Sequence, residues 1–239
     1  MHKVNIKNGS IMKLSMSQQA SDPNALVKIL EKLSNNEELD IRLDMARNPN
    51  TPIHILEKLS IDEEEYVRMA VVGNPAATKK ILKLMSCDED DYIRGRVAFN
   101  ENTPLSVLKK LSKDIDAEVR GYVAEHQKTT PKLLAILSMD EDDNIKTKVA
   151  FNPHTPIDIL QKLSTNKNYE IREAIARNPK SPVNLLVFLS KDESWQVQNI
   201  LAQNPNTPKD ISEKLFKDED MQKAVSDWRF HQKYHDHFD

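Results

Sequence analysis

The sequence repeats every 26 residues, without a gap, from Asn35 to Phe216. The seven repeats are residues 35–60, 61–86, 87–112, 113–138, 139–164, 165–190 and 191–216. Residues 21–34 match the second half of a further repeat, and residues 217–222 begin one that soon loses the pattern. A repeat this short cannot bury its own apolar side chains, so each copy must stack on its neighbours.

Each repeat has two apolar faces with helical spacing. Repeat positions 7, 11 and 12 form the first face, and positions 21, 22 and 25 form the second, where Ser212 is the one polar residue. Every repeat is therefore predicted to contain two short amphipathic helices. The composition agrees, because four glycines in 239 residues are too few for a fold rich in tight turns and hairpins. We expect an all-α fold of seven two-helix repeats with terminal half-repeats.

Proline and small polar residues mark the expected helix ends. A hydroxyl residue followed by proline is expected to cap the second helix, with proline as its first residue. These hydroxyl residues are Thr51, Thr103, Thr155, Ser181 and Thr207. An asparagine before proline is expected to end the first helix, and this applies to Asn48, Asn74, Asn152, Asn178 and Asn204. An aspartate at repeat position 2 is expected to cap the first helix, as at Asp62, Asp88, Asp114, Asp140 and Asp192.

The repeats resemble the variant leucine-rich repeat (LRV) family, a relative of the HEAT-like repeats. The match lies in VRMAVVGNP (67–75), IRGRVAFN (93–100), IKTKVAFNPHTPIDILQKLS (145–164) and IREAIARNPKSPVNLLVFLS (171–190). The resemblance extends over residues 21–216 and implies a right-handed α-solenoid whose concave face is lined by the first helices and used mainly for binding. Some members have a cysteine-rich iron–sulfur module, whereas Cys87 is the single cysteine of this sequence.

Repeat position 8 is almost always basic. The residues are Arg42, Arg68, Arg94, Arg120, Lys146 and Arg172, with Gln198 in the last repeat. One interpretation is a ladder between adjacent repeats, in which the aspartate at position 2 pairs with the arginine at position 8, and the other is an arginine track for phosphate. We favour the ladder, because the acidic partners recur in step with the basic residues.

Repeat positions 6, 10 and 13 lie on the side of the first helix opposite its apolar face. The residues there include Tyr66, Tyr92, Arg96, Phe99, Tyr122, Glu125, Lys148 and Phe151, with Arg47 and Arg177 in flanking repeats. Aromatic residues interleaved with arginine and lysine are typical of protein interfaces and can also stack nucleobases. The alternative is that these aromatic side chains pack between repeats and cover apolar surface of their neighbours.

The sequence therefore predicts a non-enzymatic scaffold that binds a protein or peptide through the concave face. The predicted binding residues are Tyr66, Tyr92, Arg96, Phe99, Tyr122, Lys148 and Phe151, with Arg47 and Arg177 as a basic flank. A nucleic-acid binder that uses Arg47, Arg96, Lys148 and Arg177 is the alternative, although a net charge of −3 has the wrong sign for it. No cofactor is expected.

The fourth repeat departs from the pattern, because EHQKTTP (125–131) replaces the usual Asn-Pro-x-Thr-Pro. Sequence drift is the favoured explanation, and a ligand pocket centred on Tyr122 and His126 is the alternative. Acidic clusters at 62–65, 88–91 and 140–143 are expected to form a solvated rim that could attract a basic partner or loosely bound cations. No catalytic constellation is present, so we expect no enzyme.

The chain ends differ from the repeats. Residues 1–20 are expected to be an extension, either disordered or a hairpin about Asn8-Gly9. Residues 21–225 are expected to form the repeat domain, and 226–239 a histidine-rich tail or cap. Asp227, His231, His235 and Asp239 follow at four-residue steps and are a weak candidate for a zinc site. With one cysteine and no long apolar run or signal peptide, a cytoplasmic protein that does not enter the membrane is expected.

Overall fold

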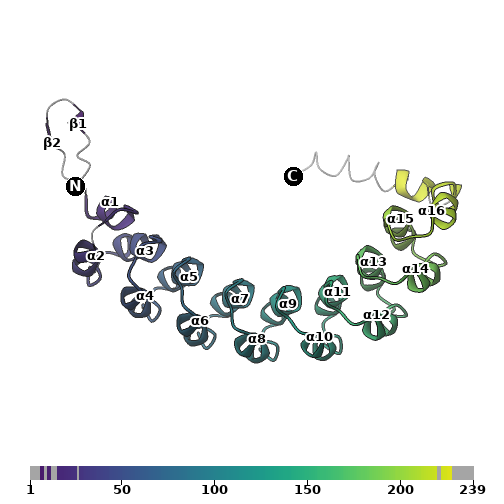
Figure 1. The fold of residues 1–239 in the computed structure, drawn as a ribbon, viewed down its shortest axis with the longest axis horizontal. Coiled ribbons are helices and arrows are strands. Elements are labelled where there is room, and N and C mark those ends of the chain that lie inside the picture. The colour runs from purple at the N-terminus through teal and green to yellow at the C-terminus, as the bar shows by residue number, and fades with distance from the viewer. Residues whose placement is uncertain (1–5, 8–9, 12–14, 26, 220–221, 228–239) are drawn as a thin grey trace. The chain divides into compact units, whose positions relative to one another are not determined.

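The computed structural model describes residues 6–7, 10–11, 15–25, 27–219 and 222–227. These residues are helical apart from short connections and one small hairpin (Figure 1). The chain divides into two compact units, Met1–Leu111 (unit 1) and Ser112–Asp239 (unit 2), and the boundary coincides with the end of a second helix.

Unit 1 contains β1 (Ile6–Lys7), β2 (Ser10–Ile11), α1 (Met16–Ser21), α2 (Val27–Leu33), α3 (Leu39–Arg47), α4 (Ile53–Leu59), α5 (Glu65–Gly73), α6 (Lys79–Met85), α7 (Asp91–Phe99) and α8 (Leu105–Leu111). Unit 2 contains α9 (Ala117–Glu125), α10 (Pro131–Leu137), α11 (Asp143–Phe151), α12 (Ile157–Leu163), α13 (Tyr169–Arg177), α14 (Val183–Leu189), α15 (Trp195–Gln203) and α16 (Lys209–Phe216). Each 26-residue repeat therefore contributes one odd-numbered first helix and one even-numbered second helix, as predicted.

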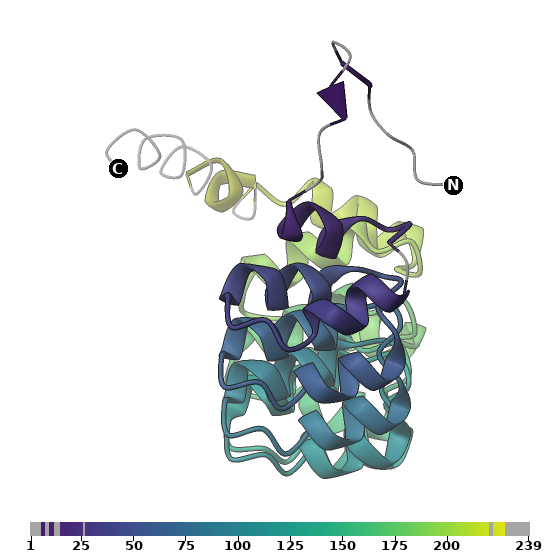
Figure 2. The same cartoon turned by 90° about the vertical axis from the view of Figure 1, so that its left-hand side faces the viewer.

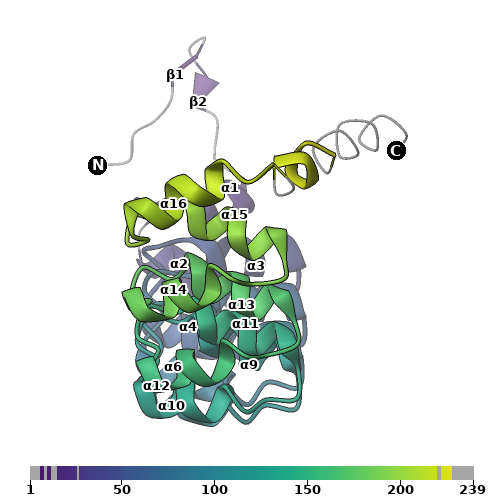
Figure 3. The same ribbon diagram turned by 90° about the vertical axis from the view of Figure 1, so that its right-hand side faces the viewer.

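Within each unit the helices form two layers. Figure 2 views the chain from the unit 1 side and shows its purple-to-teal helices stacked in two columns. Figure 3 shows the same arrangement in unit 2, with α10, α12 and α14 in one column and α9, α11 and α13 in the other. Consecutive first helices within a unit pack directly on one another, whereas consecutive second helices make few contacts. Each unit is thus an α-solenoid that curves towards its first helices.

The apolar positions form the core between these layers, as the periodicity predicts. Position 7 is buried in all seven repeats, from Ile41 to Val197, and position 11 is completely buried in each. Positions 21, 22 and 25 are buried in every repeat except the last, where Ile211 and Ser212 are partly exposed. Helices of seven to nine residues are only marginally stable on their own. Each fully buried aliphatic side chain stabilises the folded chain by about 1.5–3 kcal/mol before the cost of chain entropy, so burial of these two apolar faces is the main contribution to the stability of the stacked repeats.

The threonines that precede proline do not cap the second helix, which corrects the prediction. Thr51 donates its hydroxyl hydrogen bond back to the carbonyl of Met45, at 2.6 Å, and Pro52 is the N-cap of α4 without a side-chain bond. The same bond to the last turn of the first helix recurs at Thr103, Thr129, Thr155, Ser181 and Thr207. The hydroxyl-bearing residue is buried, and a buried hydroxyl without a hydrogen-bond partner would be costly.

The aspartates at position 2 are also not the N-caps that the sequence suggested. The N-cap lies two residues later, and Asp90 and Asp116 accept the capping bonds from Ile93 and Val119. The position 2 aspartate instead forms a turn just before the helix; Asp88, for example, accepts a bond from the backbone N–H of Asp90 at 3.1 Å. This leaves its carboxylate free to bind another partner, described below.

The asparagine before proline ends the first helix, as predicted, and has a second role that was not predicted. The side-chain amide of Asn178 donates to the carbonyls of Ala150 at 2.7 Å and Asn152 at 3.1 Å in the preceding repeat. Equivalent bonds to the preceding repeat are made by Asn48, Asn74, Asn100, Asn152 and Asn204. Because these amides are largely buried, the asparagines hydrogen-bond neighbouring repeats into a fixed register.

The N-terminal segment contains two short paired strands and a helix. β1 and β2 pair antiparallel, with Ile6 opposite Ile11 and Lys7 opposite Ser10. Helix α1 begins at Met16, inside the expected extension of residues 1–20, and packs on α2 and α3 with Ala20 buried. Ala20 occupies repeat position 12, so α1 is a short first helix in register with the repeats. At the other end, residues 222–227 are helical and Val225 is buried.

Candidate functional site

The side of the first helices opposite the core presents aromatic rings to solvent. We call this surface, formed by repeat positions 6, 10 and 13, the first-helix face. In unit 1 it contains Tyr66, Tyr92 and Phe99, which are 54%, 57% and 60% exposed, together with exposed Arg96. In unit 2 it contains Phe151, which is 50% exposed. None of these four side chains is buried, whereas Tyr122 on α9 is only partly exposed.

Arg96 and Phe99 lie together in unit 1. The guanidinium carbon of Arg96 is 5.9 Å from the centre of the Phe99 ring, one helical turn away on α7. A cation at this distance from a ring gains about 0.5–1 kcal/mol at an exposed site. The pair is therefore held as a mixed basic and aromatic patch rather than as two independent side chains.

A second such cluster surrounds half-buried Lys148 in unit 2. Its ammonium group is 5.2 Å from the centre of the Tyr122 ring and 3.3 Å from the carboxylate of Glu125. The lysine lies across Gly121, where a Cβ atom would approach its Cδ and Nζ to 3.2 Å. Gly121 was not identified as a site residue, although a glycine inside a predicted helix is the kind of signal that indicates a close approach.

The two arginines of the predicted basic flank differ in their surroundings. Arg177 is exposed and donates to Glu173 of the same helix at 2.6 Å, so a neighbouring carboxylate offsets its charge. Arg47 is also exposed, and it makes no ion pair with any residue that the structure describes. The predicted binding residues thus fall on one kind of face in both units, with Arg96 beside Phe99 and Lys148 beside Tyr122.

The arginines at position 8 form the predicted ladder with aspartate. Arg172 donates from Nε and Nη2 to the two carboxylate oxygens of Asp192 in the next repeat, at 2.7 and 2.9 Å. Its Nη1 donates to the carbonyls of Asn166 and Lys167, at 2.7 and 3.0 Å. The same pairing joins Arg42 to Asp62, Arg68 to Asp88, and Arg120 to Asp140.

The pairing raises the pKa of Arg172 above its ordinary value, chiefly through the hydrogen bond to Asp192. The hydrogen bond from Arg120 likewise lowers the pKa of Asp140. All five position 8 arginines are therefore occupied by structural contacts, because Arg94 also donates to the carbonyls of Asp88 and Glu89, both at 3.0 Å. Lys146 makes a different contact, with Asp143 of its own helix at 2.6 Å, and Gln198 donates to the carbonyl of Asp192.

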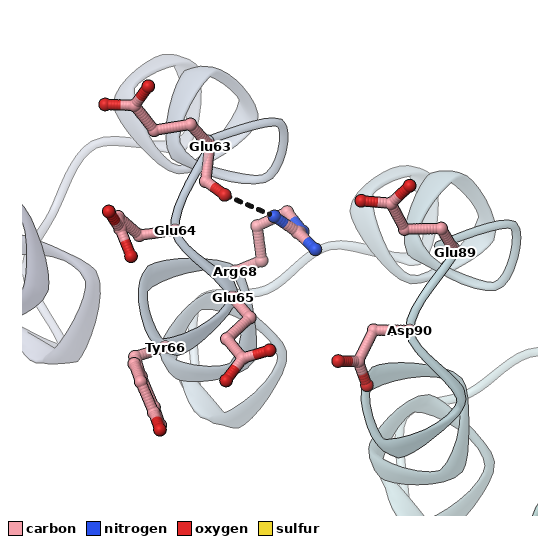
Figure 4. Close-up of a pocket in the computed structure, with 7 residues that line it drawn as sticks. All are labelled: Glu63, Glu64, Glu65, Tyr66, Arg68, Glu89 and Asp90. Atoms are coloured by element: carbon pink, nitrogen blue, oxygen red, sulfur yellow. Dashed lines mark hydrogen bonds between the residues drawn. The ribbon is translucent and has the colours of Figure 1, made fainter.

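An acidic hollow borders the first-helix face of unit 1, where α5 and α7 begin. It has a volume of about 500 Å³, and Figure 4 shows the side chains around it. The lining residues are Glu63, Glu64, Glu65, Tyr66, Arg68, Glu89 and Asp90. Carboxylates therefore predominate around one exposed tyrosine and one buried arginine.

Two further groups identified from the sequence have local structural explanations. His126 is buried at the position where other repeats have asparagine, and its Nδ1 accepts a hydrogen bond from the N–H of Lys128, as the asparagine oxygen does elsewhere. Cys87 is exposed and accepts from the ammonium of Lys110 at 2.8 Å. This hydrogen bond lowers the pKa of the thiol.

The candidate zinc ligands lie mainly outside the described residues. Asp227 is at the end of the described chain, whereas His231, His235 and Asp239 fall beyond it. Within the part of the chain that the structure describes, no three histidine, cysteine or acidic side chains come together as metal ligands would. None of the described helices is both long enough and apolar enough to cross a membrane.

Comparison with known proteins identifies the fold. No family model and no curated protein matches this sequence. A solved structure described as a leucine-rich repeat variant with a novel repetitive structural motif is similar over 89% of this chain and 85% of its own, with 24% sequence identity and a TM-score of 0.66. The resemblance inferred from the repeats is thereby confirmed at the level of architecture: the chain has the α-solenoid fold of a leucine-rich repeat variant.

Proposed function

We propose that this chain is a non-enzymatic scaffold that binds a protein or peptide partner through its first-helix face. The observation that supports the proposal is the exposure of Tyr66, Tyr92, Phe99 and Phe151 on a surface that is not part of the core. Large rings are costly to leave in water, and aromatic residues with neighbouring arginine are enriched at the centres of protein interfaces.

The internal repeats provide a second argument, because they separate structural positions from variable ones. Position 11 is aliphatic or methionine in every repeat, and position 12 is alanine or valine. Position 6 holds residues of five different kinds, namely Asp40, Tyr66, Tyr92, Glu118, Asn144, Glu170 and Gln196. Side chains that vary while the fold repeats are available for recognition, and the bulkiest of them are grouped in adjacent repeats.

A nucleic-acid partner is less well supported by the surroundings of the basic residues. Lys148 and Arg177, two of the four cations required for it, lie beside carboxylates at 3.3 and 2.6 Å. Binding to phosphate would have to separate these pairs, and the net charge of −3 adds a general repulsion. We therefore favour a protein partner.

The proposal can be tested by affinity capture from the native host with the double variant Tyr92→Ala/Phe99→Ala. Ile53→Ala/Leu105→Ala is the matched control, because these exposed apolar residues lie on the second helices. Since all four side chains are largely exposed, each change should alter the free energy of unfolding by about 1 kcal/mol or less.

Quantitative mass spectrometry should identify proteins that the wild type and the control capture and the first variant does not. A photo-crosslinking residue at position 92, but not one at position 105, should label the same partner directly. Identical captured proteins for all three forms, or a captured fraction that nuclease treatment removes, would contradict the proposal.

A further inference from the structure

We infer that the partner segment bound by unit 1 is basic, and that it places lysine or arginine side chains between Tyr66, Tyr92 and the carboxylates at the start of α5 and α7. The inference rests on the proposed function, since it specifies the chemistry of the partner on the same first-helix face. It depends on the exposed tyrosine rings, on the carboxylates beside them and on which of these carboxylates already form ion pairs within the chain.

The basic residue that lines the hollow, Arg68, is already held by structural contacts. Arg68 is buried and donates to both oxygens of Asp88, at 2.9 and 3.1 Å. Its remaining terminal nitrogen donates to the backbone carbonyls of Asp62 and Glu63, at 2.8 and 3.1 Å, and Figure 4 marks the bond to Glu63. Four of its five N–H donors are therefore used by the ladder and by the backbone just before α5.

The surrounding carboxylates are not compensated in the same way. Glu64, Glu65 and Glu89 make no ion pair with any residue in the described part of the chain. Glu64 is the N-cap of α5 but accepts no capping bond through its side chain, and Glu65 lies in the first turn of the same helix. Arg42 and Arg68 act on Glu64 and Glu89 only at longer range, so these carboxylates leave one edge of the face negative and open to a direct ion pair with a partner.

Tyr66 lines the hollow together with these carboxylates, and Tyr92 is exposed near the start of α7. Tyr66 follows Glu65 in the first turn of α5, and Tyr92 follows Asp91 in the first turn of α7. A ring face beside carboxylates is a favourable site for a guanidinium or ammonium group, which gains a cation–π contact and an ion pair together. Phosphate would be repelled by the same edge, so charge complementarity selects a basic peptide over nucleic acid.

Unit 2 provides an internal comparison, because it has carboxylates without tyrosine at the same repeat positions. Its position 6 residues are Glu118, Asn144, Glu170 and Gln196, and Glu141 occupies the position equivalent to Glu63 and Glu89. If negative charge alone attracted basic peptides, neutralising carboxylates in unit 2 would weaken binding as much as neutralising those in unit 1.

The test measures fluorescence anisotropy of the full chain with a fluorescein-labelled oligoarginine peptide. Oligoglutamate and single-stranded oligouridylate of equal length serve as comparison probes. Glu64→Gln/Glu65→Gln/Glu89→Gln should weaken oligoarginine binding about tenfold, the expected sum of three exposed ion pairs. The charge-matched variant Glu118→Gln/Glu141→Gln/Glu170→Gln should change the affinity by about twofold or less, because it alters only the long-range field.

A second pair of variants distinguishes the contribution of the tyrosine rings to binding from that of their hydroxyl groups. Tyr66→Phe/Tyr92→Phe keeps both rings and should retain the wild-type affinity, whereas Tyr66→Leu/Tyr92→Leu should weaken binding about fivefold or more. Circular dichroism of each variant verifies that the helices remain folded.

Three results would overturn the inference: no binding of oligoarginine, equal weakening by the two charge-matched triple variants, or preferential binding of oligouridylate. The proposed function is judged separately by the capture experiment. If Tyr92→Ala/Phe99→Ala loses its partner while the glutamine variant of unit 1 keeps it, the scaffold function stands and the basic partner does not.

Discussion

The buried pair between Arg172 and Asp192 provides a stringent test of how the repeats are held together. Their side chains are only 8% and 5% exposed, and the two oxygens of Asp192 accept from Nε and Nη2 at 2.7 and 2.9 Å. Replacing Asp192 by asparagine keeps the shape of the side chain but removes the charge. The guanidinium then stays buried with one amide oxygen and two backbone carbonyls for its donors, and the exposed carboxylate of Glu193, 3.6 Å from Nη2, is its remaining counter-charge.

Removing one partner of a buried pair costs about 3–5 kcal/mol in favourable cases. Because Nη1 keeps its bonds to Asn166 and Lys167, we expect Asp192→Asn to cost about 3 kcal/mol of unfolding free energy. Arg172→Met should cost a similar amount, since the carboxylate of Asp192 would keep only the backbone N–H of Ser194. The double variant should cost less than the sum, with a coupling energy of about 2 kcal/mol.

The assay is urea unfolding followed by circular dichroism, combined with hydrogen exchange of α13 and α15. Hydrogen exchange is needed because a repeat array can open in parts, so a single transition can hide a local loss. Lys146→Met is the matched control at the same repeat position, where the contact is to exposed Asp143 and should contribute much less than the buried pair. If Asp192→Asn destabilises no more than Lys146→Met, the ladder is not a structural device and its arginines would be available for a ligand.

Two further predictions concern ionisable groups. Arg120 lowers the pKa of Asp140, so the ionised carboxylate stabilises the folded protein above about pH 4. This stabilisation is lost as the pH falls through the folded-state pKa of Asp140. The urea unfolding midpoint of Asp140→Asn should therefore decrease less steeply with acidification than that of the wild type. Lys110 lowers the pKa of the Cys87 thiol, so more of the thiol is in the reactive thiolate form. Lys110→Met should therefore slow alkylation of Cys87 by iodoacetamide severalfold near neutral pH, as measured by mass spectrometry. Equal alkylation rates for the wild type and the variant would contradict this prediction.

The core and the repeat boundaries could be predicted because one local rule is applied seven times. The spacing of apolar residues at positions 7 and 11 specifies which side of each first helix is buried, and the next repeat covers that side. Residues such as Val97 and Ile145 could therefore be assigned to the core without knowledge of any long-range contact. The Arg–Asp ladder was predictable for the same reason, because both partners recur at constant separation.

The side-chain hydrogen bonds were harder to predict, because each acceptor is a backbone carbonyl that has no sequence signature. Thr51 has the chemistry of an N-cap, but the carbonyl of Met45 lies within reach at 2.6 Å, and the hydroxyl donates to it. The position of Lys148 over Tyr122 was also missed. It depends on the absent side chain of Gly121, and two consecutive repeats with glycine at this position were the available signal.

The division of labour within the repeat explains why recognition is expected on the first-helix face. The packing of each repeat is explained by its apolar positions. Its buried polar groups are explained by the Arg–Asp ladder, the asparagines before proline and the buried threonines. Every residue added for binding must avoid those positions, or it would leave a buried donor or acceptor unpaired. Positions 6, 10 and 13 escape this constraint while remaining on rigid helices, so exposed Tyr92 and Phe99 can present rings to a partner without altering how their repeats stack.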